Sequence, residues 1–277
     1  TDHGVNVFVF DWYWYEGGPF LENTLNNGFL KAQNNEKMQF YLMWANVDIH
    51  WRYFNVHKYG NDESLLLNAA VDWENFKIIV DRVIKQYFKQ PNYFKIDGMP
   101  VFSIFDEHSL LESFGGSVEE TRKAFDYFRD EVKKAGFPGL HLQWNRGTGY
   151  IMPEEEAKQF SERVKTLGFN SVTFYTMGGN NKDYLVYGKN SIELREWMDA
   201  ILDIPFFPCV SVGWDNSPRY PAMGTNDVVH YNNTPQSFAM LLQKAKQYLD
   251  NHPEQPKIIV VNAWNEWVEG SYLFVIL

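Results

Sequence analysis

The sequence predicts a (β/α)8 TIM barrel that forms a single domain over residues 1–277 and lacks the first βα unit. Strand-like runs alternate strictly with helical patterns, which indicates a parallel sheet covered by helices. Every strand begins apolar and ends in polar residues, and 277 residues suit one barrel of roughly 250. A doubly wound sheet would gather such polar ends at one switch point. Here they follow every strand, so a barrel fits better.

Seven apolar runs rich in β-branched and aromatic residues predict the strands, over residues 5–11, 38–46, 99–106, 139–145, 170–176, 206–216 and 257–266. Seven strands and six helices are one βα unit short of a closed eight-stranded barrel. The opening TDHG resembles the end of a helix that runs into a strand. We therefore expect the absent unit to be the first one.

Apolar residues at helical spacing predict helices over 73–87, 121–132 and 238–249, and further helices near 19–35, 153–167 and 190–203. The expected start and stop signals are a capping box at Ser117 and Glu120, a cap with an N1 proline at Thr234-Pro235, and glycines after two helices, Gly136 and Gly168. No repeat or low-complexity linker indicates a second domain.

The composition excludes several classes of partner. A net charge of −10 and a pI near 5.2 argue against nucleic acid or an anionic membrane surface. No apolar run is long enough to span a membrane. The single cysteine, Cys209, lies in an apolar run and is expected to be a buried, inert thiol. The scattered histidines form no zinc motif, and no cofactor or metal-binding motif is present, so we expect no metal and no cofactor.

Polar and aromatic residues follow the strands, where barrel enzymes place their chemistry. The candidate substrate-binding residues after the first four strands are Asp11, Tyr13, Trp14, Trp44, Asn46, Asp106, Trp144 and Asn145. Two long loops also follow strands, over residues 47–71 and 215–233, and long loops in this position carry function.

The sixth strand carries Trp214 near its end, and Asp215 and Arg219 flank Pro218. These two charged side chains could bind substrate hydroxyls or could pair with each other and stiffen the turn. We expect at least two of three tryptophans to line one cleft with Asp11 and Asp215; the three are Trp44, Trp214 and Trp264.

The last strand leads into Trp264, Asn265, Glu266 and Glu269. Indole rings can stack on a pyranose ring, and two glutamates can supply acid and base. The alternative is a turn whose glutamates face water, as surface carboxylates usually do. If the segment is helical, the two carboxyl groups lie within roughly 5–6 Å. One pKa should then rise, because two carboxylates so close do not both ionise freely.

The chain resembles the WbsX-type proteins, which are similar to glycoside hydrolase family 99. The stretches that carry the resemblance are FVFDWYWYEGGPFLE, FYLMWAN, KIDGMPVFSIF, VSVGWDNSPR, NNTPQSF and NAWNEWVEGSYL. They occur in the family's order and cover nearly the whole chain. The resemblance implies a (β/α)8 barrel that acts on carbohydrate, because characterised family 99 members are retaining endo-α-mannosidases. Many WbsX-like members carry a glycosyltransferase label.

The resemblance also implies roles for the two glutamates. Glu269 would be the general acid/base, and Glu266 would deprotonate the 2-hydroxyl of the sugar, which then attacks the anomeric carbon. Spacing alone does not distinguish this from direct attack by Glu266. The sequence thus predicts a retaining glycoside hydrolase acting on a poly- or oligosaccharide. The alternatives are a glycosyltransferase, for which we find no phosphate-binding loop or D-x-D motif, and a non-catalytic carbohydrate-binding barrel.

Overall fold

The computed structural model describes residues 4–54, 56–60, 62–147, 149–178, 181–219 and 229–273. The chain divides into two compact units, and each consists of three separate segments. Unit 1 comprises Thr1–Trp51, Glu63–Asn145 and Glu162–Asn170, and unit 2 comprises Arg52–Asp62, Arg146–Ser161 and Ser171–Leu277. The expectation of a single domain stays a prediction.

Unit 1 contains a sheet whose central strands are parallel. The strands β1 (Val7–Tyr15), β3 (Gln39–Trp44), β7 (Met99–Ile104) and β8 (His141–Arg146) are hydrogen-bonded in the order β8-β7-β3-β1. The short strand β2 (Gly18–Phe20) pairs antiparallel with β1, and β6 (Lys95–Ile96) pairs antiparallel with β7. All four predicted strands of this unit are confirmed. β1 continues past Asp11 to Tyr15 because Gly17, at φ +77°, allows a tight turn into β2.

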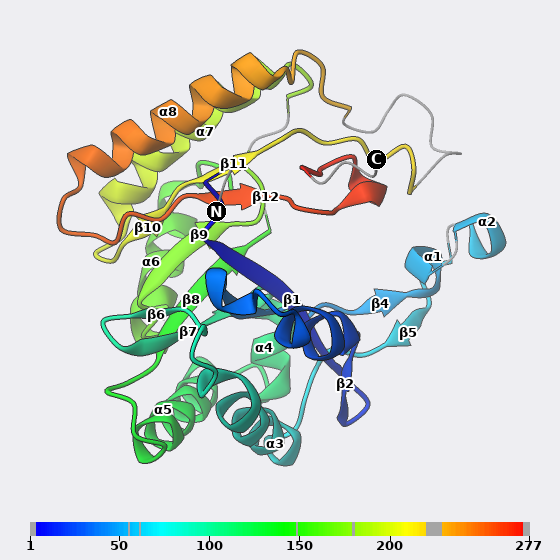
Figure 1. The fold of residues 1–277 in the computed structure, drawn as a ribbon, viewed down its shortest axis with the longest axis vertical. Coiled ribbons are helices and arrows are strands. Elements are labelled where there is room, and N and C mark those ends of the chain that lie inside the picture. The colour runs from blue at the N-terminus through cyan, green and yellow to red at the C-terminus, as the bar shows by residue number, and fades with distance from the viewer. Residues whose placement is uncertain are drawn as a thin grey trace. The chain divides into compact units, whose positions relative to one another are not determined.

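The helices α3 (Trp73–Val83), α4 (Glu107–Ser113) and α5 (Val118–Lys134) belong to unit 1 (Figure 1). A π-helical turn, η4 (Ile84–Phe88), extends α3. The N-cap of the expected capping box is present at α5, since the Ser117 hydroxyl accepts from the Glu120 amide at 3.3 Å, while the Glu120 carboxylate pairs with Lys123. Gly136 and Gly168 both have positive φ directly after their helices.

The helix predicted near residues 19–35 is only partly present. The structure has a π-helical turn, η1 (Thr24–Gly28), and two 3-10 turns, η2 (Phe29–Lys31) and η3 (Asn35–Lys37). The local sequence, NTLNNG, explains this, because asparagine and glycine disfavour the α-helix.

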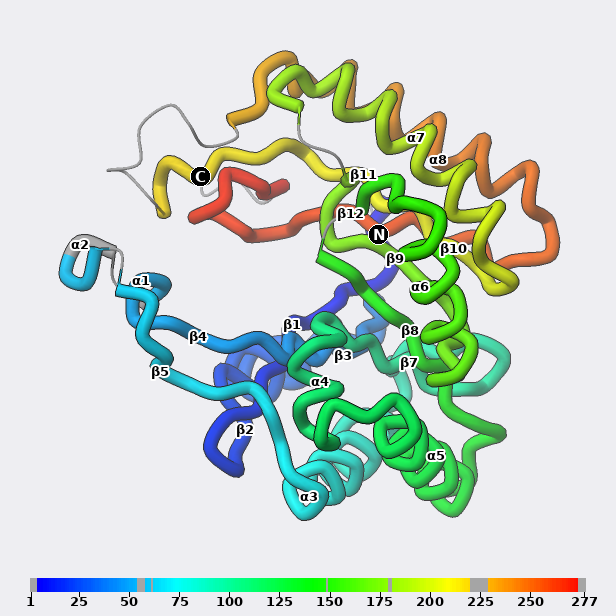
Figure 2. The backbone as a smooth tube through the Cα atoms, turned by 180° about the vertical axis from the view of Figure 1, so that it is seen from behind, coloured from blue at the N-terminus to red at the C-terminus, as the bar shows by residue number. Residues whose placement is uncertain are grey.

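The long loop after β3 forms a hairpin of its own. Strands β4 (Ile49–His50) and β5 (Leu65–Leu67) pair antiparallel, and the short helices α1 (Trp51–Phe54) and α2 (Val56–Tyr59) lie between them in the chain (Figure 2).

The helix α6 (Glu154–Leu167) confirms the helix predicted over 153–167, and its residues are divided between the two units after Ser161.

Unit 2 contains two parallel strand pairs. Strand β9 (Ser171–Phe174) pairs with β10 (Phe206–Phe207), and β11 (Cys209–Ser211) pairs with β12 (Val260–Asn262). The strand predicted over 206–216 is thus split at Pro208, which has no N–H to donate. Its carbonyl still accepts from Val260 N at 3.0 Å.

The helices α7 (Tyr184–Ile201) and α8 (Pro235–Asn251) lie side by side in unit 2 (Figures 1 and 2). α7 begins six residues earlier than predicted, because Asp183 caps it by accepting from Leu185 N at 2.9 Å. The cap of α8 at Thr234 and its N1 proline are confirmed.

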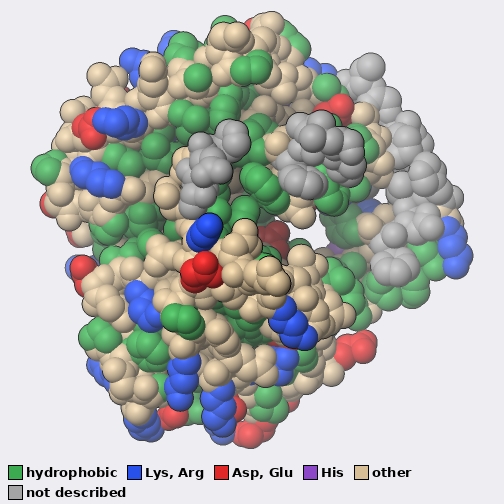
Figure 3. All heavy atoms as spheres, in the orientation of Figure 1, with side chains coloured by type: hydrophobic (Ala, Val, Ile, Leu, Met, Phe, Trp, Pro, Cys, Tyr) green, Lys and Arg blue, Asp and Glu red, His purple; other side chains and the backbone are tan. Residues whose placement is uncertain are grey.

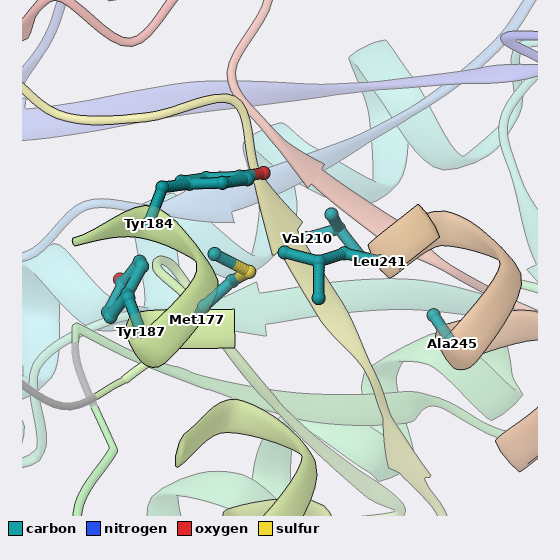
Figure 4. Packing of buried hydrophobic residues seen from close by; sticks show 6 residues of the cluster. All are labelled: Met177, Tyr184, Tyr187, Val210, Leu241 and Ala245. Carbon is teal, nitrogen blue, oxygen red and sulfur yellow. The ribbon is translucent and has the colours of Figure 1, made fainter. Parts of the chain in front are cut away.

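A buried cluster joins these helices to β11 (Figure 4). Tyr184 and Tyr187 come from α7, Val210 from β11, and Leu241 and Ala245 from α8; Met177 completes the cluster from the loop after β9. The Tyr184 hydroxyl donates to the Ser211 carbonyl at 2.5 Å. This hydrogen bond from α7 therefore fixes the end of β11, which leads into Trp214 and Asp215.

Candidate active site

The segment after β12 is closed into a compact loop. The Asn262 side-chain oxygen accepts from the hydroxyls of Ser211, at 2.9 Å, and Ser271, at 2.7 Å. The Ser271 amide donates to the Glu266 carbonyl at 3.0 Å, and the Leu273 amide to the Ala263 carbonyl at 3.0 Å. Asn262 and Ser271 are buried. These bonds fix both ends of the stretch that carries the two glutamates.

The stretch that carries the two glutamates forms a 3-10 turn rather than an α-helix. The turn η6 spans Trp267–Glu269, and Glu266 precedes it. Glu266 is the N-cap, with φ −78° and ψ +69°, and Glu269 is the last residue of the turn. Gly270 ends the turn at φ +59°. A Cβ at Gly270 would lie 2.6 Å from the Asp215 Cβ, so glycine is required by the close approach of the loop after β11.

The Glu269 carboxyl is buried and has a strongly shifted pKa. Its pKa is raised to about 7: burial is the main cause, the Arg219 guanidinium opposes the rise, and the charge of Glu266 adds to it. Arg219 Nη1 lies 2.7 Å from Oε1 of Glu269. The other oxygen, Oε2, is buried and has no hydrogen-bond partner among the residues described. The predicted rise of one pKa is found here, but its main cause is burial rather than the neighbouring carboxylate.

The loop after β11 is attached to this turn. The Asp215 amide donates to the Glu269 carbonyl at 2.7 Å. The Asp215 carboxylate accepts from the Ser217 amide, at 2.9 Å, and hydroxyl, at 2.5 Å. Of the two interpretations of Asp215 and Arg219, mutual pairing is therefore not the arrangement observed, because Arg219 forms its ion pair with Glu269. Residues 220–228 of the predicted 215–233 loop lie outside the described residues.

Exposed aromatic side chains accompany the glutamates. Trp264 is 41% exposed, Trp267 45% and Tyr272 45%, and Trp214 is partly exposed. Asn265 is also exposed. Trp267, which is interleaved with the two glutamates in the sequence, was not among the predicted substrate-binding residues, and neither was Tyr272. The sequence interpretation also missed Ser211 and Ser271, because their contacts with Asn262 join separate positions of the chain.

Within unit 1, three of the predicted residues share one face of the sheet. Asp11 lies opposite Met43 in the register of β1 and β3, and Tyr13 follows two residues later on the same face. The Asn145 amide nitrogen lies 2.8 Å from the Met43 sulfur, so Asn145 belongs to this face too. Its side-chain oxygen is buried without a partner among the described residues.

Three predicted stacking residues lie in the core instead. Trp14, Trp44 and Trp144 are 3%, 1% and 3% exposed. Trp44 contacts Phe76 of α3, at 6.4 Å between ring centroids. Trp144 stacks on Phe169 at 5.5 Å. Because side chains alternate across a strand, these rings face the helices and present no open face to a sugar.

Asn46 and Asp106 are hydrogen-bonded to each other, and Asp106 also caps a helix. Asn46 is 2% exposed; its side-chain oxygen accepts from the Asp106 amide at 2.8 Å, and its nitrogen donates to the Asp106 carbonyl at 2.5 Å. The Asp106 carboxylate caps α4 by accepting from Ser109 N at 2.7 Å. The residues that remain candidates for substrate contact are therefore Asp11, Tyr13 and Asn145 in unit 1 and the residues after β11 and β12 in unit 2. A common cleft for Trp214, Trp264, Asp11 and Asp215 stays a prediction.

Among the residues that the structure describes, no three His, Cys, Asp or Glu side chains gather in a way that could hold a metal ion. None of the helices in these ranges combines the length and apolar character that crossing a membrane requires. On the face shown in Figure 3, Lys and Arg side chains lie among Asp and Glu rather than in one continuous patch.

Parallel strands that alternate with helices, with carboxylate and indole side chains beyond their carboxyl ends, define a protein of the (β/α)8 class. Solved structures with this fold are similar over most of the chain. The GH99 endo-alpha-mannosidase from Bacteroides thetaiotaomicron matches 95% of this chain and 64% of its own, with a TM-score of 0.54 and 13% identity. A glycoside hydrolase-like protein matches 98% of this chain and 74% of its own, with a TM-score of 0.60 and 13% identity. Identities this low show the fold alone.

The chain belongs to the family described as Glycosyltransferase WbsX, whose model matches residues 1–274. The resemblance inferred from the sequence motifs is thereby confirmed. An uncharacterized protein WxcX from Xanthomonas campestris pv. campestris (strain ATCC 33913) is 24% identical over 285 residues, as is its counterpart from strain B100. The match covers 98% of this chain but 37% of each relative, so the chain spans little more than a third of their length.

Proposed function

We propose that this chain is a retaining glycoside hydrolase that cleaves an O-glycosidic bond in a poly- or oligosaccharide. One observation carries the proposal: a buried carboxyl group, Glu269, has a pKa of about 7 and lies on the same turn as a second glutamate, Glu266. A carboxyl group with such a pKa is partly protonated near neutral pH, as a general acid must be. The exposed indoles of Trp264 and Trp267 lie on the same segment and can stack on sugar rings.

The proposed mechanism has two steps with retention of configuration. In the first step, Glu269 donates its proton to the glycosidic oxygen as the C–O bond breaks, and Glu266 accepts the proton of the sugar 2-hydroxyl. The 2-oxygen attacks the anomeric carbon and gives a 1,2-anhydro sugar. In the second step, water opens this ring, Glu269 takes the proton of the water, and Glu266 returns a proton to the 2-oxygen. Direct attack by Glu266 is the alternative that the spacing leaves open.

An α-mannoside is the substrate that we propose, because a structure of similar fold is described as an endo-alpha-mannosidase. The decisive experiment incubates the protein with a panel of bacterial and fungal polysaccharides, α-mannans included, without any nucleotide sugar, and analyses the products. We expect new reducing ends with the wild type and none with Glu266→Gln. The exposed Glu254→Gln serves as the matched control and should behave as the wild type. No product from any member of the panel would overturn the hydrolase.

A 2-deoxy substrate separates the two nucleophiles. It lacks the internal 2-hydroxyl, so we expect it to be cleaved far more slowly than the parent sugar. Equal rates for the two would exclude the 2-hydroxyl mechanism and favour direct attack by Glu266.

A second candidate function is glycosyl transfer, which the family's name favours. The same panel distinguishes it when nucleotide sugars are added. A transferase would lengthen the acceptor only when a nucleotide sugar is present and would release no reducing ends in its absence.

A further inference from the structure

The two oxygens of the Glu269 carboxyl group are not equivalent. Oε1 lies 2.7 Å from Arg219 Nη1, whereas Oε2 is buried and has no hydrogen-bond partner among the described residues. The side chain of Glu269 is 10% exposed and that of Arg219 is 28% exposed. The ion pair is therefore largely removed from water, where such a contact is stronger than at an open surface.

This asymmetry decides where a proton can reside. A guanidinium group has only donors, so the oxygen that it contacts must act as an acceptor. The hydroxyl oxygen of a protonated carboxyl group accepts such a bond less well than its carbonyl oxygen does, so a proton on Oε1 would weaken the contact with Arg219. When Glu269 is protonated, the proton therefore lies on Oε2, the oxygen that no described residue occupies.

We propose that Arg219 is a positioning residue that holds Oε1 of Glu269 and thereby makes Oε2 the atom that donates the catalytic proton. This inference rests on the proposed hydrolase function. In the reaction, the O–H bond at Oε2 breaks and the proton moves to the glycosidic oxygen. That oxygen keeps the electron pair of the broken C–O bond. The Glu269 carboxylate that remains is stabilised by the Arg219 charge, and it is protonated again by the water that enters in the second step.

The charged groups around Glu269 make the effect of Arg219 measurable. Arg219 comes from the loop after β11 and Glu266 from the start of the same turn; the first lowers the pKa of Glu269 and the second raises it. Asp215, also on the loop after β11, faces the turn with its backbone amide, while its carboxylate accepts from Ser217. Loss of the Arg219 charge leaves burial and Glu266 unopposed, so the pKa of Glu269 should rise further above 7.

The alternative is a purely structural role, in which Arg219 only holds the loop after β11 against the turn. The backbone bond between the Asp215 amide and the Glu269 carbonyl already does this at 2.7 Å. A purely structural tie would change stability and activity together, without a shift in any titration. A positioning role predicts changes in the pKa of one carboxyl group and in the dependence on the leaving group.

The test compares Arg219→Gln, which removes the charge, with Arg219→Lys, which keeps it. A matched control is Arg163→Gln, because Arg163 lies 2.7 Å from Glu107 and this ion pair belongs to unit 1. Protein labelled with 13C at the glutamate carboxyl carbons is titrated by NMR, and Glu269→Gln identifies the resonance. We expect the Glu269 midpoint to rise by about one pH unit or more in Arg219→Gln, as loss of an adjacent opposite charge does. It should stay near the wild-type value in Arg219→Lys and in Arg163→Gln.

The second measurement follows hydrolysis of aryl glycosides across pH. Arg219→Gln should move the alkaline limb of kcat/KM upward. It should lower kcat at least tenfold for poor leaving groups, change it little for good ones, and leave KM unchanged. An unshifted Glu269 titration, or an equal loss for all leaving groups, would overturn the inference. If the wild type hydrolyses nothing yet the NMR midpoint moves, the proposed function fails while the coupling between Arg219 and Glu269 stands.

Discussion

At the scale of single residues, the chemistry depends on how strongly each polar side chain is buried. Glu266 and Glu269 are three positions apart and chemically identical, yet only Glu269 is buried. Its pKa is raised to about 7. Desolvation penalises the charged form of a carboxyl group, which is why one glutamate of the pair can keep a proton near neutral pH. The ion pair with Arg219 reduces this effect without cancelling it.

The raised pKa of Glu269 predicts how stability depends on pH. The ordinary pKa is 4.5 and the folded value about 7, so the folded state binds more protons between these values. Stability should therefore fall as the pH rises from about 4.5 to about 7, by up to about 3 kcal/mol from this group. Urea unfolding of the wild type and of Glu269→Gln at pH 4.5 and pH 8 measures this, and the wild type should lose more. The same pH dependence in both proteins would contradict the prediction.

Two tryptophans test the distinction between a binding ring and a core ring. Trp264→Ala should weaken oligosaccharide binding by about tenfold with the fold intact, because stacking contributes on the order of 1 kcal/mol. Trp44→Ala should instead cost about 3–5 kcal/mol of unfolding free energy, because Trp44 is 1% exposed and packs under α3. Calorimetric titration and thermal melting measure the two effects. Unchanged affinity in Trp264→Ala would remove this ring from the proposed site.

At the scale of elements, the turn η6 and the loop after β11 depend on each other. Gly270 lets the loop approach, Asp215 donates a backbone hydrogen bond to the turn, and Arg219 supplies the charge. The Asn262 side chain and the two serines that bond to it hold the base of the segment. The proposed acid is thus held by three kinds of contact from outside its own turn.

Gly270→Ala should break this arrangement. The new Cβ would lie 2.6 Å from the Asp215 Cβ in a backbone conformation at φ +59°. The matched control is Gly115→Ala, because Gly115 has φ +68° but nothing within 4 Å of the position of a Cβ. Both variants bear the cost of the left-handed conformation, about 1 kcal/mol, and only Gly270→Ala adds the clash. We expect Gly270→Ala to lose at least 1 kcal/mol more in urea unfolding, and equal losses would show that the loop moves away freely.

At the scale of the whole molecule, neither unit is a continuous stretch of sequence. Each consists of three segments, so the chain passes between the units several times. Neither can therefore be excised as a single fragment that retains its own strands and helices. The expectation of a single domain stays a prediction.

Thermal unfolding should accordingly be one cooperative transition. A calorimetric enthalpy equal to the van 't Hoff enthalpy would support this, because interleaved segments must unfold together. Two resolved transitions, with only one of them changed by Gly270→Ala, would show that the units unfold independently.

Much of the fold follows from the sequence alone. The predicted strands (one of which the structure splits at Pro208), the helices α3, α5, α6, α7 and α8, and the caps at Ser117 and Thr234 all depend on patterns within a few residues. Such patterns act locally, since side-chain periodicity and capping groups are set by near neighbours in the chain. The family membership was equally readable, because its motifs are short and ordered.

Only the tertiary structure decided which side chains belong to the candidate site. Trp44 and Trp264 both follow strands, and the sequence does not show that one packs under a helix while the other is 41% exposed. Arg219 and Glu269 are fifty residues apart, and their contact depends on how two strand ends lie beside each other. Burial and electrostatic pairing are properties of the packed chain. Local sequence patterns therefore predicted the elements and the two glutamates, and packing determined that Glu269 is the buried one.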